Sequence, residues 1–190
     1  MAVTTFRRLI RAGLIPDVSR RGVRVMVPLE TVQSLSARST ASLSALASPE
    51  VAVLRVDAAR QVQDPDREGR EWTGFSTTLS PEDILKALRG WWRCDAPSVA
   101  EGGIVPVTVS SFVVAVLTGL QRWESNGRGR HAFPDAELAG YVTDLARPAT
   151  HLTALTAGER ERAQLLLGTR LVTHSGGPIA YVATGNRSAN

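Results

Sequence analysis

The chain has 190 residues, of which 43% are hydrophobic and 21% are charged, and its formal net charge is +4. These values are typical of one ordinary globular domain, or of one domain with a small additional module. No apolar run reaches the roughly 18 residues that a membrane span needs. The single Cys94 excludes an internal disulfide framework and a zinc site with several thiolates.

The N-terminus shows no signal-peptide pattern, because three arginines at positions 7, 8 and 11 interrupt what would be its apolar segment. We therefore expect a cytoplasmic protein with a reduced cysteine and no membrane partner.

The positive charge is concentrated at the start of the chain. Residues 1–38 hold seven arginines against Asp17 and Glu30, a net charge of +5, and residues 39–190 carry a net charge of −1. Lys86 is the only lysine, and arginine is the residue preferred for bidentate contacts to phosphate and guanine.

Residues 1–38 predict a helix, a hairpin and a second helix. The first helix runs from Phe6 to Ala12, with Thr4 or Thr5 as its cap and Gly13 after its end. After Pro16, alternating valines in residues 17–27 surround Arg20-Arg21-Gly22 and predict a hairpin with a basic tip. Pro28 then opens a helix over residues 29–37.

Residues 39–49 are small and mostly uncharged, and we interpret them as a linker before a larger region at residues 50–184. Residues 185–190 are expected to form a disordered tail. The domain boundaries are therefore 1–38, 39–49, 50–184 and 185–190.

The larger region predicts a β-rich domain with two helices. Ser80-Pro81-Glu82-Asp83 and Thr156-Ala157-Gly158-Glu159 are capped helix starts, for helices to about Arg89 and Leu167. Residues 64–71 predict a polar loop. Strands are predicted at 51–56, 104–109, 112–120, 130–133, 139–143 and 179–183, with Ser110-Ser111 between the second and third. This order favours an α+β fold with a barrel or half-barrel over a parallel α/β sheet.

The segment Thr5-Phe6-Arg7-Arg8-Leu9-Ile10-Arg11-Ala12-Gly13-Leu14-Ile15-Pro16 resembles the recognition helix and exit turn of the MerR/excisionase-like winged helix-turn-helix family. The segment from Val23 to Val32 resembles the wing strand and following helix of that family. The resemblance covers about 35 residues. It implies that the recognition helix enters the major groove of DNA and that the wing contacts the backbone.

The family has a further helix before the recognition helix, and in this sequence only five residues precede Phe6. Either the true start lies upstream of Met1, or the larger region or a partner chain replaces that helix. A module of three elements buries little apolar area and is expected to be marginally stable alone.

The charge pattern favours DNA binding independently of the resemblance. Arginines in the first helical turn face the positive end of the helix dipole, and a nearby polyanion would offset that repulsion. The hairpin arginines would reach phosphates or a minor groove. The candidate nucleic-acid-binding residues are Thr5, Arg7, Arg8, Arg11, Arg20, Arg21 and Arg24.

A second candidate ligand site is Trp91-Trp92-Arg93, since tryptophan and arginine stack on bases. Adjacent tryptophans point in different directions, so we expect one in the core and the other at a pocket rim. Residues 176–181 do not match a phosphate-binding loop. Such a loop contains a lysine and leads into a helix, whereas Gly176-Gly177-Pro178 has no lysine after it and precedes a predicted strand. The layout of the larger region is loosely similar to PUA-like barrels that hold nucleic acid.

No enzyme is predicted. His131, His151 and His174 have no metal-ligand spacing, and Cys94 has no identifiable base, although an approach by Arg93 would lower its pKa. We expect no catalytic residue, metal or cofactor.

The sequence favours a non-enzymatic DNA-binding protein, such as a transcriptional regulator or a mobile-element accessory factor. Its partner is double-stranded DNA, and its larger region senses a ligand or forms a homodimer. Two alternatives stay open. One is an RNA- or modified-nucleotide-binding β-barrel module, and the other is an antitoxin-like interaction subunit that is completed by a partner chain.

Overall fold

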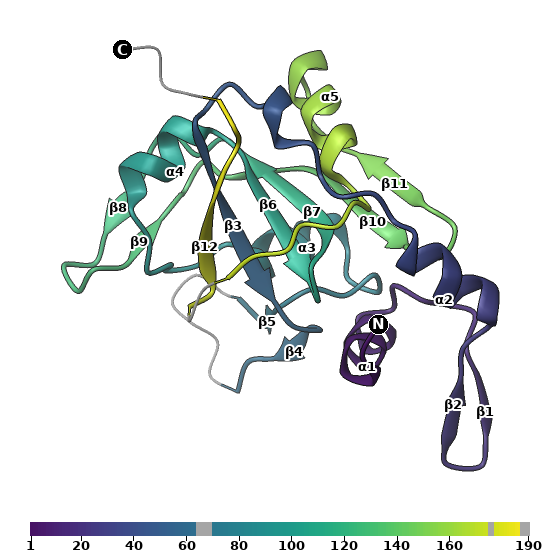
Figure 1. The fold of residues 1–190 in the computed structure, drawn as a ribbon. Helices are drawn as coiled ribbons and strands as arrows, with labels where there is room; N and C mark the ends of the chain where they lie inside the picture. The colour runs from purple at the N-terminus through teal and green to yellow at the C-terminus, as the bar shows by residue number, and fades with distance from the viewer. Residues whose placement is uncertain (64–69, 175–176, 187–190) are drawn as a thin grey trace.

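The computed structural model describes residues 1–63, 70–174 and 177–186 and shows a mixed α+β fold with a sheet-rich body (Figure 1). Part of the predicted loop at residues 64–71 and most of the predicted tail lie outside the described residues. The described helices are α1 (Val3–Arg11), α2 (Leu29–Ser36), the 3₁₀ turn η1 (Leu43–Ala45), α3 (Pro81–Leu88), α4 (Ala96–Gly102) and α5 (Ala157–Leu166).

Six strands form the central sheet in the order β11-β10-β7-β6-β3-β12. They are β3 (Glu50–Val56), β6 (Val105–Val109), β7 (Phe112–Thr118), β10 (Glu137–Asp144), β11 (Ala149–Leu152) and β12 (Ile179–Ala183). β3 and β6 are parallel, and the other neighbouring pairs are antiparallel. Every residue of β6 and β7 is buried, and these strands are accordingly apolar except for Thr108 and Thr118.

The sequence predicted a barrel or half-barrel, and in the part of the chain that the structure describes the strands do not close into a barrel. β11 and β12 lie at opposite edges of the sheet, so the described strands form an open sheet. Three small two-stranded sheets lie outside it. Their strands are β1 (Ser19–Arg21) with β2 (Arg24–Met26), β4 (Arg60–Gln61) with β5 (Trp72–Thr73), and β8 (Glu124–Ser125) with β9 (His131–Ala132).

Helix α4 was not among the predicted elements, so the body has three described α-helices instead of two. Its sequence, Ala-Pro-Ser-Val-Ala-Glu-Gly, is too short to show a helical apolar pattern. Proline in the first turn starts it, and Gly103 ends it in a left-handed conformation at φ 62°. α4 packs on β3, and α5 packs on β7 and β10.

Both predicted capped helices are confirmed. The Ser80 hydroxyl accepts a hydrogen bond from the Asp83 amide at the start of α3, at 3.1 Å. The Thr156 hydroxyl likewise accepts from the Glu159 amide at the start of α5, at 3.3 Å. In both helices the cap satisfies an N–H group that has no partner within the helix.

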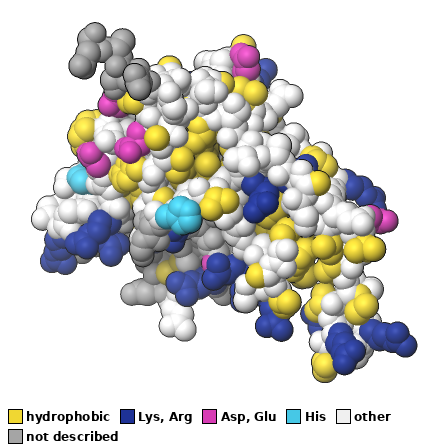
Figure 2. Space-filling model, in the orientation of Figure 1, with side chains coloured by type: hydrophobic (Ala, Val, Ile, Leu, Met, Phe, Trp, Pro, Cys, Tyr) yellow, Lys and Arg dark blue, Asp and Glu magenta, His cyan; other side chains and the backbone are white. Residues whose placement is uncertain are grey.

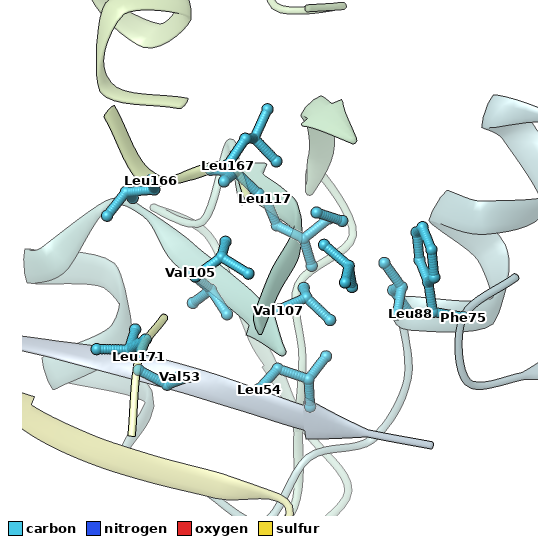
Figure 3. Packing of buried hydrophobic residues seen from close by; sticks show 14 of the residues in the cluster. Val53, Leu54, Phe75, Leu88, Val105, Val107, Leu117, Leu166, Leu167 and Leu171 are labelled. Atoms are coloured by element: carbon cyan, nitrogen blue, oxygen red, sulfur yellow. The ribbon is translucent and has the colours of Figure 1, made fainter. Parts of the chain in front are cut away.

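The N-terminal elements share the core of the body. Leu9, Leu14, Ile15 and Leu35 are almost fully buried and belong to the same hydrophobic cluster as the central sheet. Figure 3 shows the centre of that cluster, where side chains of α3, α5, β3, β6 and β7 meet. Apolar burial therefore continues from α1 into the sheet.

Backbone hydrogen bonds fix α1 to the body. The Thr77 amide donates to the Ala12 carbonyl at 3.0 Å, and the Leu145 amide donates to the Leu14 carbonyl at 2.9 Å. The Arg38 guanidinium, at the end of α2, donates to the Leu145 carbonyl at 2.6 Å. The hairpin β1–β2, in contrast, projects from the molecule (Figure 1).

Residues 39–49 also contact the body. The Ala41 amide donates to the Arg170 carbonyl and the Arg170 amide donates to the Ser39 carbonyl, each at 2.8 Å. Leu43 and Leu46 are buried in the shared core. Near the C-terminus, the Asn186 side chain donates to backbone carbonyls of Ser44 and Leu46. The segment interpreted as a linker is thus held at several points.

Candidate nucleic-acid interface

Three arginines lie on one face of α1. Leu9 is the fully buried residue of this helix, and at about 100° per residue Arg7 and Arg11 fall on the opposite side, with Arg8 on the flank next to them. All three are exposed. Thr5, the other candidate on this helix, is half-buried on the flank next to Leu9 and does not share the arginine face.

The start of α1 differs from the prediction. The helix begins at Val3 with Ala2 at the cap position, so neither Thr4 nor Thr5 caps it, and Ala2 has no side-chain cap hydrogen bond. The first turn also has no acidic residue. The expected repulsion between first-turn arginines and the helix dipole is therefore wrong: Arg7 lies in the middle of α1, and Arg8 and Arg11 lie in its last turn, where the dipole favours positive charge.

The hairpin adds three more exposed arginines. Arg21 and Arg24 are directly opposite each other in the β1–β2 ladder, and Arg20 pairs with Val25. Like charges opposite each other destabilise a hairpin. Within the described residues, Arg7, Arg20, Arg21 and Arg24 make no ion pair. Figure 2 shows basic side chains at the outer end of the hairpin, beside hydrophobic surface.

A groove of about 860 Å³ lies between α1 and the hairpin. Its lining is mostly apolar, and none of the described residues that line it is acidic. The arginines that line it are Arg7, Arg8, Arg11, Arg20 and Arg24. The structure therefore brings together five of the six arginines predicted to bind nucleic acid, and Arg21 lies outside this lining.

Asp57 partly neutralises two of these arginines. It follows β3, and its carboxylate lies 3.7 Å from Arg8 Nε and 3.9 Å from an Arg11 terminal nitrogen. All three side chains are more than half exposed, so these ion pairs are weak. The sequence reasoning missed Asp57, although an acid directly after a predicted strand was a signal that it lies at a sheet end.

The second candidate ligand site, Trp91-Trp92-Arg93, has one residue in the core and two nearer the surface. Trp92 is 7% exposed and its ring lies 5.3 Å from that of Phe133, whereas Trp91 is half-buried and Arg93 is exposed. Trp92 lines a second cleft, of about 740 Å³, with Leu54, Leu88 and several arginines. Trp91 and Arg93 do not line that cleft.

The pKa of the Cys94 thiol is raised. The sequence had suggested the opposite, a pKa lowered by an approach of Arg93. Burial is the main cause and the negative charge of Asp95 the second, and together they raise the pKa to about 11. The thiol is therefore protonated at neutral pH and is a poor nucleophile.

The three histidines lie in different surroundings. His131 Nδ1 is 3.1 Å from the Cys94 carbonyl oxygen, His151 stacks on Tyr141 and is 3.0 Å from the Thr143 hydroxyl, and His174 is exposed. In the described ranges, no three His, Cys, Asp or Glu residues form a cluster suited to a metal ion.

Comparison with protein-family models, curated proteins and solved structures finds no match to this chain. Among the described helices, none combines the length and apolar character of a membrane span.

Proposed function

We propose that this protein binds double-stranded DNA through the exposed face of α1 and the hairpin β1–β2. The observation that carries the proposal is the groove between them, which five arginines line and where no lining residue that the structure describes is acidic. Arg8 and Arg11 share only the exposed Asp57, and Arg7, Arg20 and Arg24 make no ion pair within the described residues, so a polyanion would relieve the repulsion among these cations. The resemblance of residues 5–32 to a recognition helix and wing supports the same assignment.

The two elements have different roles in this proposal. α1 presents Arg7 on the face of a helix, from which arginine reads guanine in the major groove. Arg20, Arg21 and Arg24 on the projecting hairpin contact phosphates, which fixes position and adds salt dependence. The body then acts as a sensing or dimerising domain of a regulatory or mobile-element factor.

The test uses the full chain, a duplex enriched from a random library, and a duplex of unrelated sequence. Arg7→Gln is expected to weaken binding to the enriched duplex by about 1–3 kcal/mol and to change binding to the unrelated one less. The double change Arg20→Gln with Arg24→Gln is expected to weaken both, and to reduce the salt slope by about 2. Fluorescence anisotropy over a range of salt concentrations measures both quantities.

The matched control is Arg128→Gln with Arg162→Gln, which removes the same charge far along the chain from the N-terminal elements. It is expected to leave the salt slope nearly unchanged. Equal losses in the two double variants would reject the proposal, because net charge alone would then explain binding.

Asp57→Asn provides a test in the opposite direction. The carboxylate competes with phosphate for Arg8 and Arg11, so its neutralisation is expected to tighten duplex binding at low salt. Weaker binding in this variant would contradict a DNA contact by these two arginines.

A second candidate function is that of an interaction subunit, and the apolar lining of the groove favours it. Val3, Val23 and Met26 line the groove, and their side chains are 67%, 102% and 48% exposed. Exposed apolar surface rimmed by polar groups is typical of protein interfaces. Mass measurement of the complex purified from its native cells distinguishes a stoichiometric protein partner from DNA.

A further inference from the structure

The parallel pair β3–β6 brings two loops to one edge of the sheet. Leu54, Arg55 and Val56 of β3 pair with residues 107–109 of β6, so both strands end at the same level. Asp57 follows β3, and Ser110-Ser111 follows β6. The two arrowheads point toward the side of the molecule where α1 lies (Figure 1). Ligands of open sheets bind beyond the carboxyl ends of parallel strands.

The turn after β6 is built from unfavourable residues. Ser110 and Ser111 have φ angles of 50° and 69°, and they connect β6 and β7 as a two-residue hairpin. Such turns favour asparagine and glycine, which tolerate positive φ. Strained backbone of this kind concentrates at functional sites. The Ser110 hydroxyl is also buried without a hydrogen-bond partner in the described chain, and a buried hydroxyl of this kind is normally satisfied by a water, an ion or a ligand.

These residues line a polar hollow of about 300 Å³. Its lining includes four residues with hydroxyl side chains, two arginines and one aspartate. They are Thr108, Ser110, Ser111, Thr173, Arg8, Arg55 and Asp57. Hydroxyls and guanidinium groups are the side-chain donors that bind phosphate oxygens. The carboxylate of Asp57 is engaged by Arg8, Arg11 and, at 2.8 Å, by the Ala58 amide.

We propose that this hollow binds the phosphate group of a small phosphorylated ligand. The adjoining cleft of about 740 Å³ shares Arg55, Val56 and Asp57 with the hollow and contains Leu88 and Trp92. It offers space and apolar surface for the rest of such a ligand. Arg55 and Ser110 do not line the groove between α1 and the hairpin, so the proposal does not depend on DNA binding.

The test is calorimetric titration of the full chain with ribose 5-phosphate and with inorganic phosphate at low ionic strength. Arg55→Gln is expected to weaken binding of both probes about tenfold or more, the usual effect of a lost charge-assisted hydrogen bond. The matched control Arg60→Gln removes the same charge from the adjoining cleft only, and is expected to change inorganic phosphate binding less than about twofold.

Ser110→Gly separates ligand binding from folding. Glycine adopts φ 50° without strain and removes the unpartnered hydroxyl, so the melting temperature is expected to stay equal or rise. The affinity for both probes is nevertheless expected to fall. If Ser110 has only a structural role, the melting temperature of Ser110→Gly stays equal or rises while the affinity for both probes is unchanged. That result would overturn the proposal.

Four further outcomes test the proposal. Absence of phosphate binding by the unaltered chain, or an equal loss in Arg60→Gln and Arg55→Gln, would overturn the proposal. Displacement of inorganic phosphate by duplex DNA, together with weaker duplex binding by Ser110→Gly, would assign the hollow to the DNA backbone instead of a free ligand. Phosphate binding that persists beside saturating duplex supports the free ligand.

Discussion

Gly13 connects the N-terminal helix to the body through a conformation that other residues resist. It has φ 75°, its amide donates to the Ile10 carbonyl, and the Leu14 amide donates to the Leu9 carbonyl. This is a Schellman motif, in which glycine follows the helix. A Cβ atom at this position would collide with the Thr77 side chain.

Gly13→Ala is therefore expected to lower the free energy of unfolding by about 2 kcal/mol or more, from backbone strain and the displaced Thr77. Urea denaturation measures this change. Gly22→Ala is the control, because Gly22 also has positive φ but faces open space, and about 1 kcal/mol is expected there. Equal losses at the two positions would mean that the Thr77 contact has no effect.

Cys94 gives a prediction about pH. Its pKa is raised from 9.0 to about 11, so the folded protein holds the thiol proton more tightly than the unfolded chain. The contribution of Cys94 to the free energy of unfolding is therefore fully present below pH 9.0 and is lost as the pH rises toward about 11.

The reactivity of Cys94 follows from the same shift. At mildly alkaline pH, the native thiol is expected to react with a disulfide reagent about a hundredfold more slowly than the denatured thiol, since two pKa units separate their thiolate fractions. Stopped-flow absorbance in buffer and in urea measures the ratio. Equal rates would show that burial does not protect this group.

At the scale of elements, the capped helix α3 adds buried side chains to the body. The Ser80 hydroxyl accepts from the Asp83 amide and donates to the Asp83 carboxylate at 2.7 Å. Ile84, Ala87 and Leu88 are buried by this helix. The cap therefore stabilises an element that contributes to the main core.

Ser80→Ala is expected to lower the free energy of unfolding by about 1 kcal/mol, because one amide of the first turn loses its partner. Thermal unfolding monitored by circular dichroism measures it. Ser36→Ala, an exposed serine at the end of α2, is the control, and a change within about 0.5 kcal/mol is expected. A cap variant as stable as the control would remove the stabilising role of Ser80.

At the scale of the whole molecule, the N-terminal elements depend on the body for burial. Leu9, Leu14 and Leu35 are each 0% exposed within a core that they share with the sheet. In an isolated segment these side chains would be exposed, since three short elements cannot enclose them. The charged surface of α1 is therefore presented by the entire fold.

A peptide of residues 1–38 is accordingly expected to be largely unfolded. Circular dichroism should show little helix and no cooperative melting, because short helices are marginal without tertiary packing. A cooperative transition in the peptide would show instead that residues 1–38 form an autonomous module.

The local signals in the sequence predicted most elements. Caps at Ser80 and Thr156, glycine after α1, and valine runs for β3, β6 and β7 each act within a few residues. The strand β11 and the helix α4 were missed because each is short and has no distinct apolar period. Of the predicted barrel or half-barrel, a closed barrel was wrong because strand order depends on long-range pairing, such as β12 beside β3.

The candidate interface was predictable in part for the same reason. A helix places Arg7, Arg8 and Arg11 on one face by its period alone, and a hairpin brings Arg20 and Arg24 near each other by its turn. The proximity of Asp57 to α1, and of Ser110 to Arg8, arises from contacts between segments far apart in the sequence.

The sequence by itself determined the concentration of positive charge in residues 1–38 and the order of helix, hairpin and helix that carries it, because charge and local periodicity are properties of neighbouring residues. Only the tertiary structure decided that these elements share one core with the body, that the sheet is open, and that a polar hollow forms where β3 and β6 end. These features depend on which distant apolar faces pack together, and that is settled by burial across the whole chain.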